Sequence, residues 1–240
     1  MTATPITAAG AGTQPSESAR TAATGPGASS TGPTPAPTQQ RIEAIASRVR
    51  AWPGAVGGTN LQVLASARNT TAHAVALDPD SSTYRVSDAK TGTVSTGRFT
   101  AALPVVLGPG ETGYLAANVS TPLIEPTAHL VAEATIVGVP AELGPRALTL
   151  EVGRLHYSVD GVALEARVTN HSTATASNVV VGAVLLDGAG APIAAVYGLA
   201  ADGPLGAGRT DGLTIRSPAS GPLDPGVVQR VVATAYELGG

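Results

Sequence analysis

The segment VALEARVTNHS (residues 162–172) decides the fold class, because its side chains alternate in character along the chain. Val162, Leu164, Ala166 and Val168 fall on one face of an extended strand, and mostly charged residues fall on the other. A period of two is typical of a half-buried β-strand. Asn170 follows, and because Asn readily bonds its own backbone or adopts a left-handed turn, we expect it to close the strand.

A related segment, LQVLASARNTT (residues 61–71), lies earlier in the chain, and three further landmarks follow both segments in the same order. The strand ends at Asn69 and Asn170 are 101 residues apart, and SDAKTGTV around Asp88 matches LDGAGAPI around Asp187, 99 residues further on. VLGPGETGYL matches PLGAGRTDGL, with Leu107 and Leu205 98 residues apart. Finally, HLVAEATIV matches QRVVATAYE at a distance of 100 residues. Four landmarks at nearly constant spacing predict that one structural unit occurs twice.

Each unit has room for about seven short strands, with turn signals every 8–12 residues, which is typical of an immunoglobulin-like sandwich. The sequence therefore predicts an all-β protein with two tandem immunoglobulin-like β-sandwich domains. We place the first domain at residues 41–139 and the second at residues 140–240, with the boundary in the linker GVPAELGPR. Residues 179–186, VVVGAVLL, form a continuous apolar run that predicts a strand covered on both faces.

The segment RIEAIASRVRAW (residues 41–52) is ambiguous, because Ile42, Ile45, Val49 and Trp52 also have helical spacing. By the repeat it matches LTLEVGRLHY (residues 148–157), which alternates as a strand does. We expect both segments to be first strands, with a short helical turn at residues 41–45.

The composition excludes several functional classes. The chain has 240 residues, 17 acidic and 14 basic residues, a net charge of −3 and no Cys. Without Cys there is no disulfide framework, thiol nucleophile or Cys-based metal site. A weakly acidic chain without a basic block is a poor nucleic-acid binder. The most apolar run, residues 179–186, has eight residues, against about 20 for a transmembrane helix, so we expect no transmembrane segment.

Residues 1–40 consist mostly of Ala, Gly, Pro, Ser and Thr, with Glu17 and Arg20 as their only charges. Such a stretch buries too little apolar surface to offset the entropy of ordering it, so we expect a disordered tail. Spacers of this composition often precede an extracellular domain, which suggests an extracellular or cell-envelope protein. The chain as given begins without a basic, apolar signal peptide, so we expect its start to be internal to the gene or a leader to have been removed, and a cytoplasmic protein if the start is genuine.

Residues 155–193 resemble the FxLYD domain family. The shared features are the strand ending in Val168-Thr169-Asn170 and the apolar strand that runs into Leu185-Leu186-Asp187-Gly188. The name-giving motif keeps Leu185 and Asp187, whereas Ala183 stands where the family has Phe and Leu186 where it has Tyr. The resemblance of the first copy to the family is weaker. The resemblance implies a small β-sandwich of bacterial envelope proteins, without a catalytic role and without functional residues to transfer.

No catalytic, cofactor-binding or metal-binding residues can be nominated from motifs. The four histidines, His73, His129, His156 and His171, lie in neither an HExxH nor an HxH pattern. The sequence also lacks a GxSxG elbow and a phosphate-binding GxxxxGK[ST] loop, and the GxGxxG string GPGETG (residues 108–113) is a turn between two expected strands, not a strand-to-helix fingerprint. A pocket that joined His156 to Glu151 or Glu165 would favour an enzyme.

Two other polar patterns have a plain turn interpretation beside a functional one. Asp78, Asp80 and Ser82 place oxygen ligands at alternate positions, as calcium requires, but Asp, Pro and Ser are also ordinary loop residues. Asn69, Asn118 and Asn170 each begin an N-x-[ST] sequon. Because two of them close repeated strands, we interpret them as turn residues.

Three functions remain open. The leading hypothesis is a non-enzymatic cell-envelope or extracellular protein whose tandem sandwiches bind an unknown protein or envelope polymer. The second is a structural spacer or shell protein whose function is self-association. The third is an enzyme of unrecognised class whose residues converge only in three dimensions.

Overall fold

The computed structural model describes residues 42–54, 57–122, 129–144, 147–159, 161–200, 203–216 and 221–237. The described chain is all-β, with strands β1–β16 in several sheets and one short 3-10 helix, η1 (Pro225–Val227). The prediction of an all-β, multi-sheet sandwich fold is confirmed. No helix in these residues has the length and apolar character needed to cross a membrane. The predicted tail, residues 1–40, lies outside the described residues.

In the N-terminal half (residues 42–140), two sheets enclose a core. One sheet has the order β1 (Glu43–Pro53), β2 (Thr59–Arg68), β8 (Thr112–Thr121), β6 (Ala101–Leu103), and the other has the order β5 (Gly92–Arg98), β4 (Thr83–Asp88), β9 (Leu130–Thr135). Leu61 and Leu115 of the first sheet and Val86 of the second belong to this core. A small sheet, β10 (Gly138–Pro140), β3 (Val75–Leu77), β7 (Val106–Leu107), completes the half.

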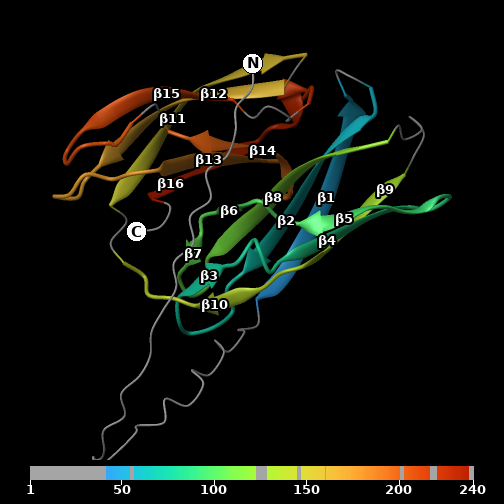
Figure 1. The fold of residues 1–240 in the computed structure, drawn as a ribbon, viewed down its shortest axis with the longest axis horizontal. Helices are drawn as coiled ribbons and strands as arrows, with labels where there is room; N and C mark the ends of the chain where they lie inside the picture. The colour runs from blue at the N-terminus through green and yellow to red at the C-terminus, as the bar shows by residue number, and fades with distance from the viewer. Residues whose placement is uncertain are drawn as a thin grey trace, which may run out of the picture. The chain divides into compact units, whose positions relative to one another are not determined.

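The C-terminal half (residues 147–237) has two sheets of its own. They have the orders β11 (Leu148–Ser158), β12 (Gly161–Asn170), β15 (Thr210–Arg216) and β14 (Pro192–Leu199), β13 (Val179–Leu186), β16 (Arg230–Glu237). Leu164 and Val168 of β12 pack with Val181 and Ala183 of β13 in their core. The described residues of the two halves nevertheless belong to one compact unit, in which the sheets lie as successive layers (Figure 1).

The local strand predictions hold at three places. Val162, Leu164, Ala166 and Val168 are buried in β12 while the charged residues between them are exposed, and every residue of β13 is buried. Residues 148–157 lie within a strand, as predicted.

The helical turn predicted for residues 41–45 is wrong in its described part. Glu43 and Ala44 are already in β1, where they pair with Arg68 and Ala67 of β2. Pairing with β2 satisfies backbone N–H and C=O groups that a single helical turn would leave without partners. A β-bulge at Ile45 interrupts the alternation, so that Ile42 and Val49, seven residues apart, both pack on the core while Ile45 is 55% exposed.

The outer faces of two sheets join the halves. Leu64, Tyr114 and Ala116 of the β1-β2-β8-β6 sheet pack in one cluster with Val184 and Ala195 of the β14-β13-β16 sheet. Both faces of β2 and of β13 are therefore covered, one by the core of its own half and one by the other half. This contact between the halves has a stacked, sheet-on-sheet form (Figure 1).

A hydrogen-bonded network crosses the contact between the halves. The fully buried Gln62 donates through Nε2 to the Ala195 carbonyl and to Oδ1 of Asn118, each at 3.0 Å, and its Oε1 accepts from the Ala195 N–H at 3.0 Å. Asn118 Nδ2 donates to the Tyr197 hydroxyl at 3.1 Å, which lies 3.0 Å from Oγ1 of Thr100. The polar groups in this contact are thus paired across it.

Candidate functional site: a pocket at the junction of the halves

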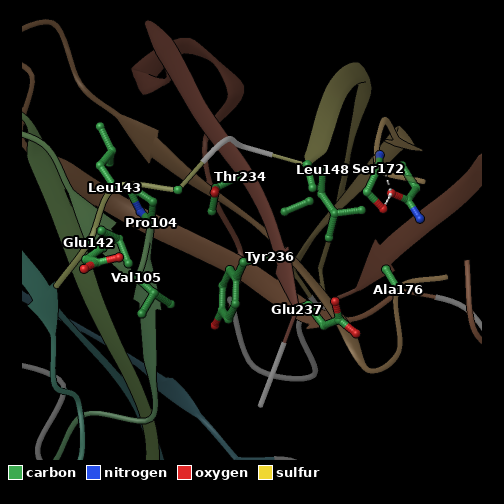
Figure 2. A pocket seen from close by; sticks show the side chains of 15 residues that line it. Pro104, Val105, Glu142, Leu143, Leu148, Ser172, Ala176, Thr234, Tyr236 and Glu237 are labelled. Carbon is green, nitrogen blue, oxygen red and sulfur yellow. Dashed lines mark hydrogen bonds between the residues drawn. The ribbon is translucent and has the colours of Figure 1, made fainter. Parts of the chain in front are cut away.

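A pocket of about 280 Å³ opens where the N-terminal half, the connection between the halves and β16 meet. Figure 2 shows Pro104, Val105, Glu142 and Leu143 on one side of it, and β16 with Tyr236 across from them. Its lining also includes Leu148, Ser172, Ala176, Thr234 and Glu237. Both halves therefore build this cavity, and neither would form it alone.

The chemistry of the junction pocket is apolar with a few polar groups. Pro104, Val105 and Leu143 supply aliphatic surface, and Leu143 is 54% exposed. The Glu237 carboxylate is already engaged, because its Oε1 accepts from the Ser177 N–H at 2.6 Å. Burial, reinforced by the neighbouring Tyr197, raises the pKa of Tyr236, so its hydroxyl stays protonated at neutral pH. Such a lining suits an apolar group that carries hydrogen-bonding atoms.

Asn170 stands behind the junction pocket and holds the local structure. Its fully buried amide donates to the carbonyls of Ala174, Leu205 and Gly206, at 2.8, 2.9 and 3.3 Å. Its Oδ1 accepts from the N–H and hydroxyl of Ser172, at 2.9 and 2.7 Å. The side chain closes β12, as predicted, and also ties it to the loop before β15.

Asn69 makes the same set of bonds in the N-terminal half. Its amide donates to the carbonyls of His73, Leu107 and Gly108, and its Oδ1 accepts from the N–H and hydroxyl of Thr71. Its side chain is also fully buried. The structure therefore supports the turn interpretation of these two sequons, since neither buried amide is accessible for modification in the folded protein. Asn118, the third, belongs to the network between the halves.

The oxygens of Asp78, Asp80 and Ser82 are arranged as a turn. Asp78 Oδ1 accepts from the Ser81 N–H at 3.0 Å, and the buried Ser82 hydroxyl donates to the Asp78 carbonyl at 2.6 Å. The same hydroxyl accepts from the Val137 N–H at 2.9 Å, so it joins this turn to the segment after β9. The described residues contain no group of three or more His, Cys, Asp or Glu that could hold a metal ion.

His156 and Glu165 come together on the outer face of the β11-β12-β15 sheet. His156 Nε2 lies 2.8 Å from Glu165 Oε1, and the side chains are 45% and 53% exposed. A shallow depression beside them is lined by Glu151, Glu165, Arg167, Gly153 and Gly212. His156 thus meets a carboxylate on an open sheet face, where solvent screens a pair of this kind.

The other three histidines are exposed. His171 Nε2 is 2.9 Å from the Thr149 hydroxyl, and the His73 carbonyl accepts from Asn69. The His129 N–H donates to Oδ2 of Asp88. The structure does not bring these histidines into one described pocket.

No family model matches the chain, and no curated protein matches it either. The site is therefore interpreted from its own residues.

Two features were missed by sequence reasoning. The junction pocket combines short segments from four places in the chain, and no motif marks it. The network between the halves did leave a signal, because Gln62 interrupts the apolar run of LQVLA (residues 61–65). A polar side chain in such a run has to find a buried partner, and here the partner lies 133 residues away.

Proposed function

We propose that the chain is a non-enzymatic bacterial cell-envelope or extracellular protein, in which a tandem pair of FxLYD-like β-sandwiches presents binding surface to a protein or an envelope polymer. The resemblance of residues 155–193 to the FxLYD family supports the setting. The shared strand order and matched Asn69 and Asn170 bonding support the tandem interpretation.

One observation carries the proposal: the polar side chains that the sequence singles out are used to hold strands together. Asn69 and Asn170 bond three carbonyls each, and Ser82 bridges two segments. Catalysis needs a nucleophile, a base and stabilising donors around one reacting atom. Side chains used in this way instead favour a protein whose activity is binding.

The junction pocket is the first surface to test, because both halves contribute to it. The full chain, fluorescently labelled, would be pelleted with purified bacterial cell-wall sacculi, before and after protease treatment of the sacculi. Retention on both preparations indicates a polymer partner, and retention only on untreated sacculi indicates a wall-attached protein. Absence of retention on both contradicts the envelope-binding proposal.

A matched pair of variants locates the contact. Leu143→Asp places a charge at the junction pocket, whereas Val159→Asp places one at an 84% exposed position in the β11–β12 hairpin. We expect Leu143→Asp to weaken retention and Val159→Asp to leave it unchanged. Release of soluble wall fragments during the assay would contradict the non-enzymatic part of the proposal.

A further inference from the structure

Three strands of each main sheet follow the same order in the two halves, β1-β2-β8 as β11-β12-β15 and β5-β4-β9 as β14-β13-β16, so their sheet faces can be compared position by position. In the β1-β2-β8-β6 sheet Leu64 pairs with Ala116, and in the β11-β12-β15 sheet Glu165 pairs with Thr214 at the equivalent place. Ser66 with Tyr114 likewise corresponds to Arg167 with Gly212. The first set is buried against the other half and the second set is exposed.

In the other pair of sheets the C-terminal half carries the apolar residues and the N-terminal half carries the polar ones. In the β14-β13-β16 sheet Val184 pairs with Ala195 and Val232, which face the N-terminal half. In the β5-β4-β9 sheet the equivalent residues are Arg85, Thr96 and Glu133, all exposed. Each half thus has one apolar and one polar outer face, and the two apolar faces are different sheets.

The contact between the halves is therefore heterologous, since unlike surfaces meet in it. A heterologous contact can in principle be repeated, and repetition produces rings or open filaments. The free ends available for repetition are the outer face of β5-β4-β9 and the outer face of β11-β12-β15. Repeat proteins end their stacks with units whose outer face is polar.

We infer that the outer faces of the β1-β2-β8-β6 and β14-β13-β16 sheets form a surface on which sandwiches of this kind stack head to tail. The charged residues on the two free outer faces limit the stack to two sandwiches; they are Arg85, Glu133, Glu165 and Arg167. In a head-to-tail stack of chains the β5-β4-β9 face would meet the β11-β12-β15 face, so Arg85 and Glu133 would leave water against Glu165 and Arg167. Desolvating such charges can cost more than their mutual attraction returns, even where they pair. This inference goes beyond the proposed function and disfavours the hypothesis of self-association.

In the test, residues of each polar outer face are replaced by the residues that stand at the equivalent positions of the buried contact between the halves. One variant carries Arg85→Val, Thr96→Ala and Glu133→Val, and the other carries Glu165→Leu, Arg167→Ser and Thr214→Ala. Polar controls carry Arg85→Thr with Glu133→Thr, and Glu165→Thr with Arg167→Thr. Circular dichroism and thermal unfolding verify the fold of each full chain, and the smaller variant Arg85→Val with Glu133→Val replaces the first if it fails to fold.

Sedimentation velocity then decides the matter. We expect the wild-type chain, each single-end variant and the polar controls to be monomers. A mixture of the two apolar variants is expected to form a heterodimer with twice the monomer mass, because a heterologous contact needs both faces. Concentration-dependent association of the wild type, or a mixture of folded apolar variants that contains only monomers, would overturn the inference. Equal association of the polar controls would also overturn it.

Discussion

The side chain of Gln62 in β2 forms hydrogen bonds with both backbone polar groups of Ala195 in β14, which is 133 residues away. Ala195 lies in an edge strand of its sheet, and a free strand edge presents unpaired N–H and C=O groups. The carboxamide of Gln62 offers one donor and one acceptor side by side, as a neighbouring strand would. A side chain from one half thus completes the backbone bonding of the other.

Replacement of Gln62 by Ala is expected to lower the free energy of unfolding by about 2–4 kcal/mol, because it leaves the buried Ala195 groups without partners. Chemical denaturation of the full chain measures the change. Gln229→Ala is the control, since the Gln229 side chain donates to the Gly226 carbonyl at an exposed place. Equal effects of the two substitutions would show that the Gln62 bonds contribute little.

The paired strand-end asparagines predict a second and symmetrical result. Asn69→Ala leaves three carbonyls without their amide donor, and so does Asn170→Ala. We expect each substitution to cost about 2–4 kcal/mol of unfolding free energy, because it removes several hydrogen bonds at once, including the acceptor for the N–H and hydroxyl of Thr71 or Ser172. The control is Asn60→Ala, whose side chain accepts one exposed bond from Ser120 and whose loss is expected to cost less than about 1 kcal/mol.

The comparison between the two asparagines is also informative. Because their bonding is the same, the two losses should agree to within about 1 kcal/mol, the usual spread of a single hydrogen bond. A large cost at one position with none at the other would mean that the two strand ends do not play the same role. Urea denaturation of both variants, followed by fluorescence of Trp52, supplies the measurement.

Much of the local structure could be predicted from the sequence, because it depends on near neighbours. Alternation in residues 162–168 identified β12, and the apolar run of residues 179–186 identified a strand buried on both faces. The equivalence of Asn69 and Asn170 followed from their spacing. In contrast, the bulge in β1 made residues 41–52 ambiguous, because one extra residue interrupts the period of two.

The contact between the halves and the junction pocket could not be predicted in the same way. Residues such as Leu64 and Val184 look like ordinary strand residues, and only the stacked arrangement shows which face they cover. The sequence did contain a difference in polarity between the two repeats, however, since Leu64 corresponds to Glu165 and Val184 corresponds to Arg85. An apolar residue in one copy opposite a charge in the other indicates a face that is buried once and exposed once.

Close approach of the two halves depends on a position without a side chain. A methyl group on Gly182 of β13 would lie 2.6 Å from Cδ2 of Leu103 and 3.1 Å from Cβ of Tyr197. Gly182→Ala is therefore expected to lower the free energy of unfolding by about 1–3 kcal/mol through overpacking. Gly198→Ala in β14 is the control, because a methyl group there meets no atom within 4 Å.

A second substitution tests whether Leu103 is the cause. Leu103→Ala alone is expected to cost about 2–5 kcal/mol as a cavity. If the two residues compete for one space, the double variant should lose less than the sum of the single losses. Strict additivity in urea denaturation would place the Gly182→Ala effect elsewhere.

Acid lability is expected to involve Asp187, which turns β13 into β14. The N–H of Ala191 holds the pKa of the Asp187 carboxyl below its ordinary value, assisted by the N–H of Ala189 and by Arg48 at 2.8 Å. Because the folded-state pKa is depressed, the carboxylate stabilises the fold above its unfolded-state pKa of about 3.9. That contribution is lost as the pH falls through the folded-state pKa.

Asp187→Asn keeps an oxygen acceptor for the two N–H groups but removes the charge. The difference in unfolding free energy between wild type and this variant should be constant near neutral pH and should shrink below about pH 4. Urea denaturation across this pH range measures it, and added salt should reduce the part that is due to Arg48. A difference that grows on acidification would mean that the carboxylate is not favoured in the folded state.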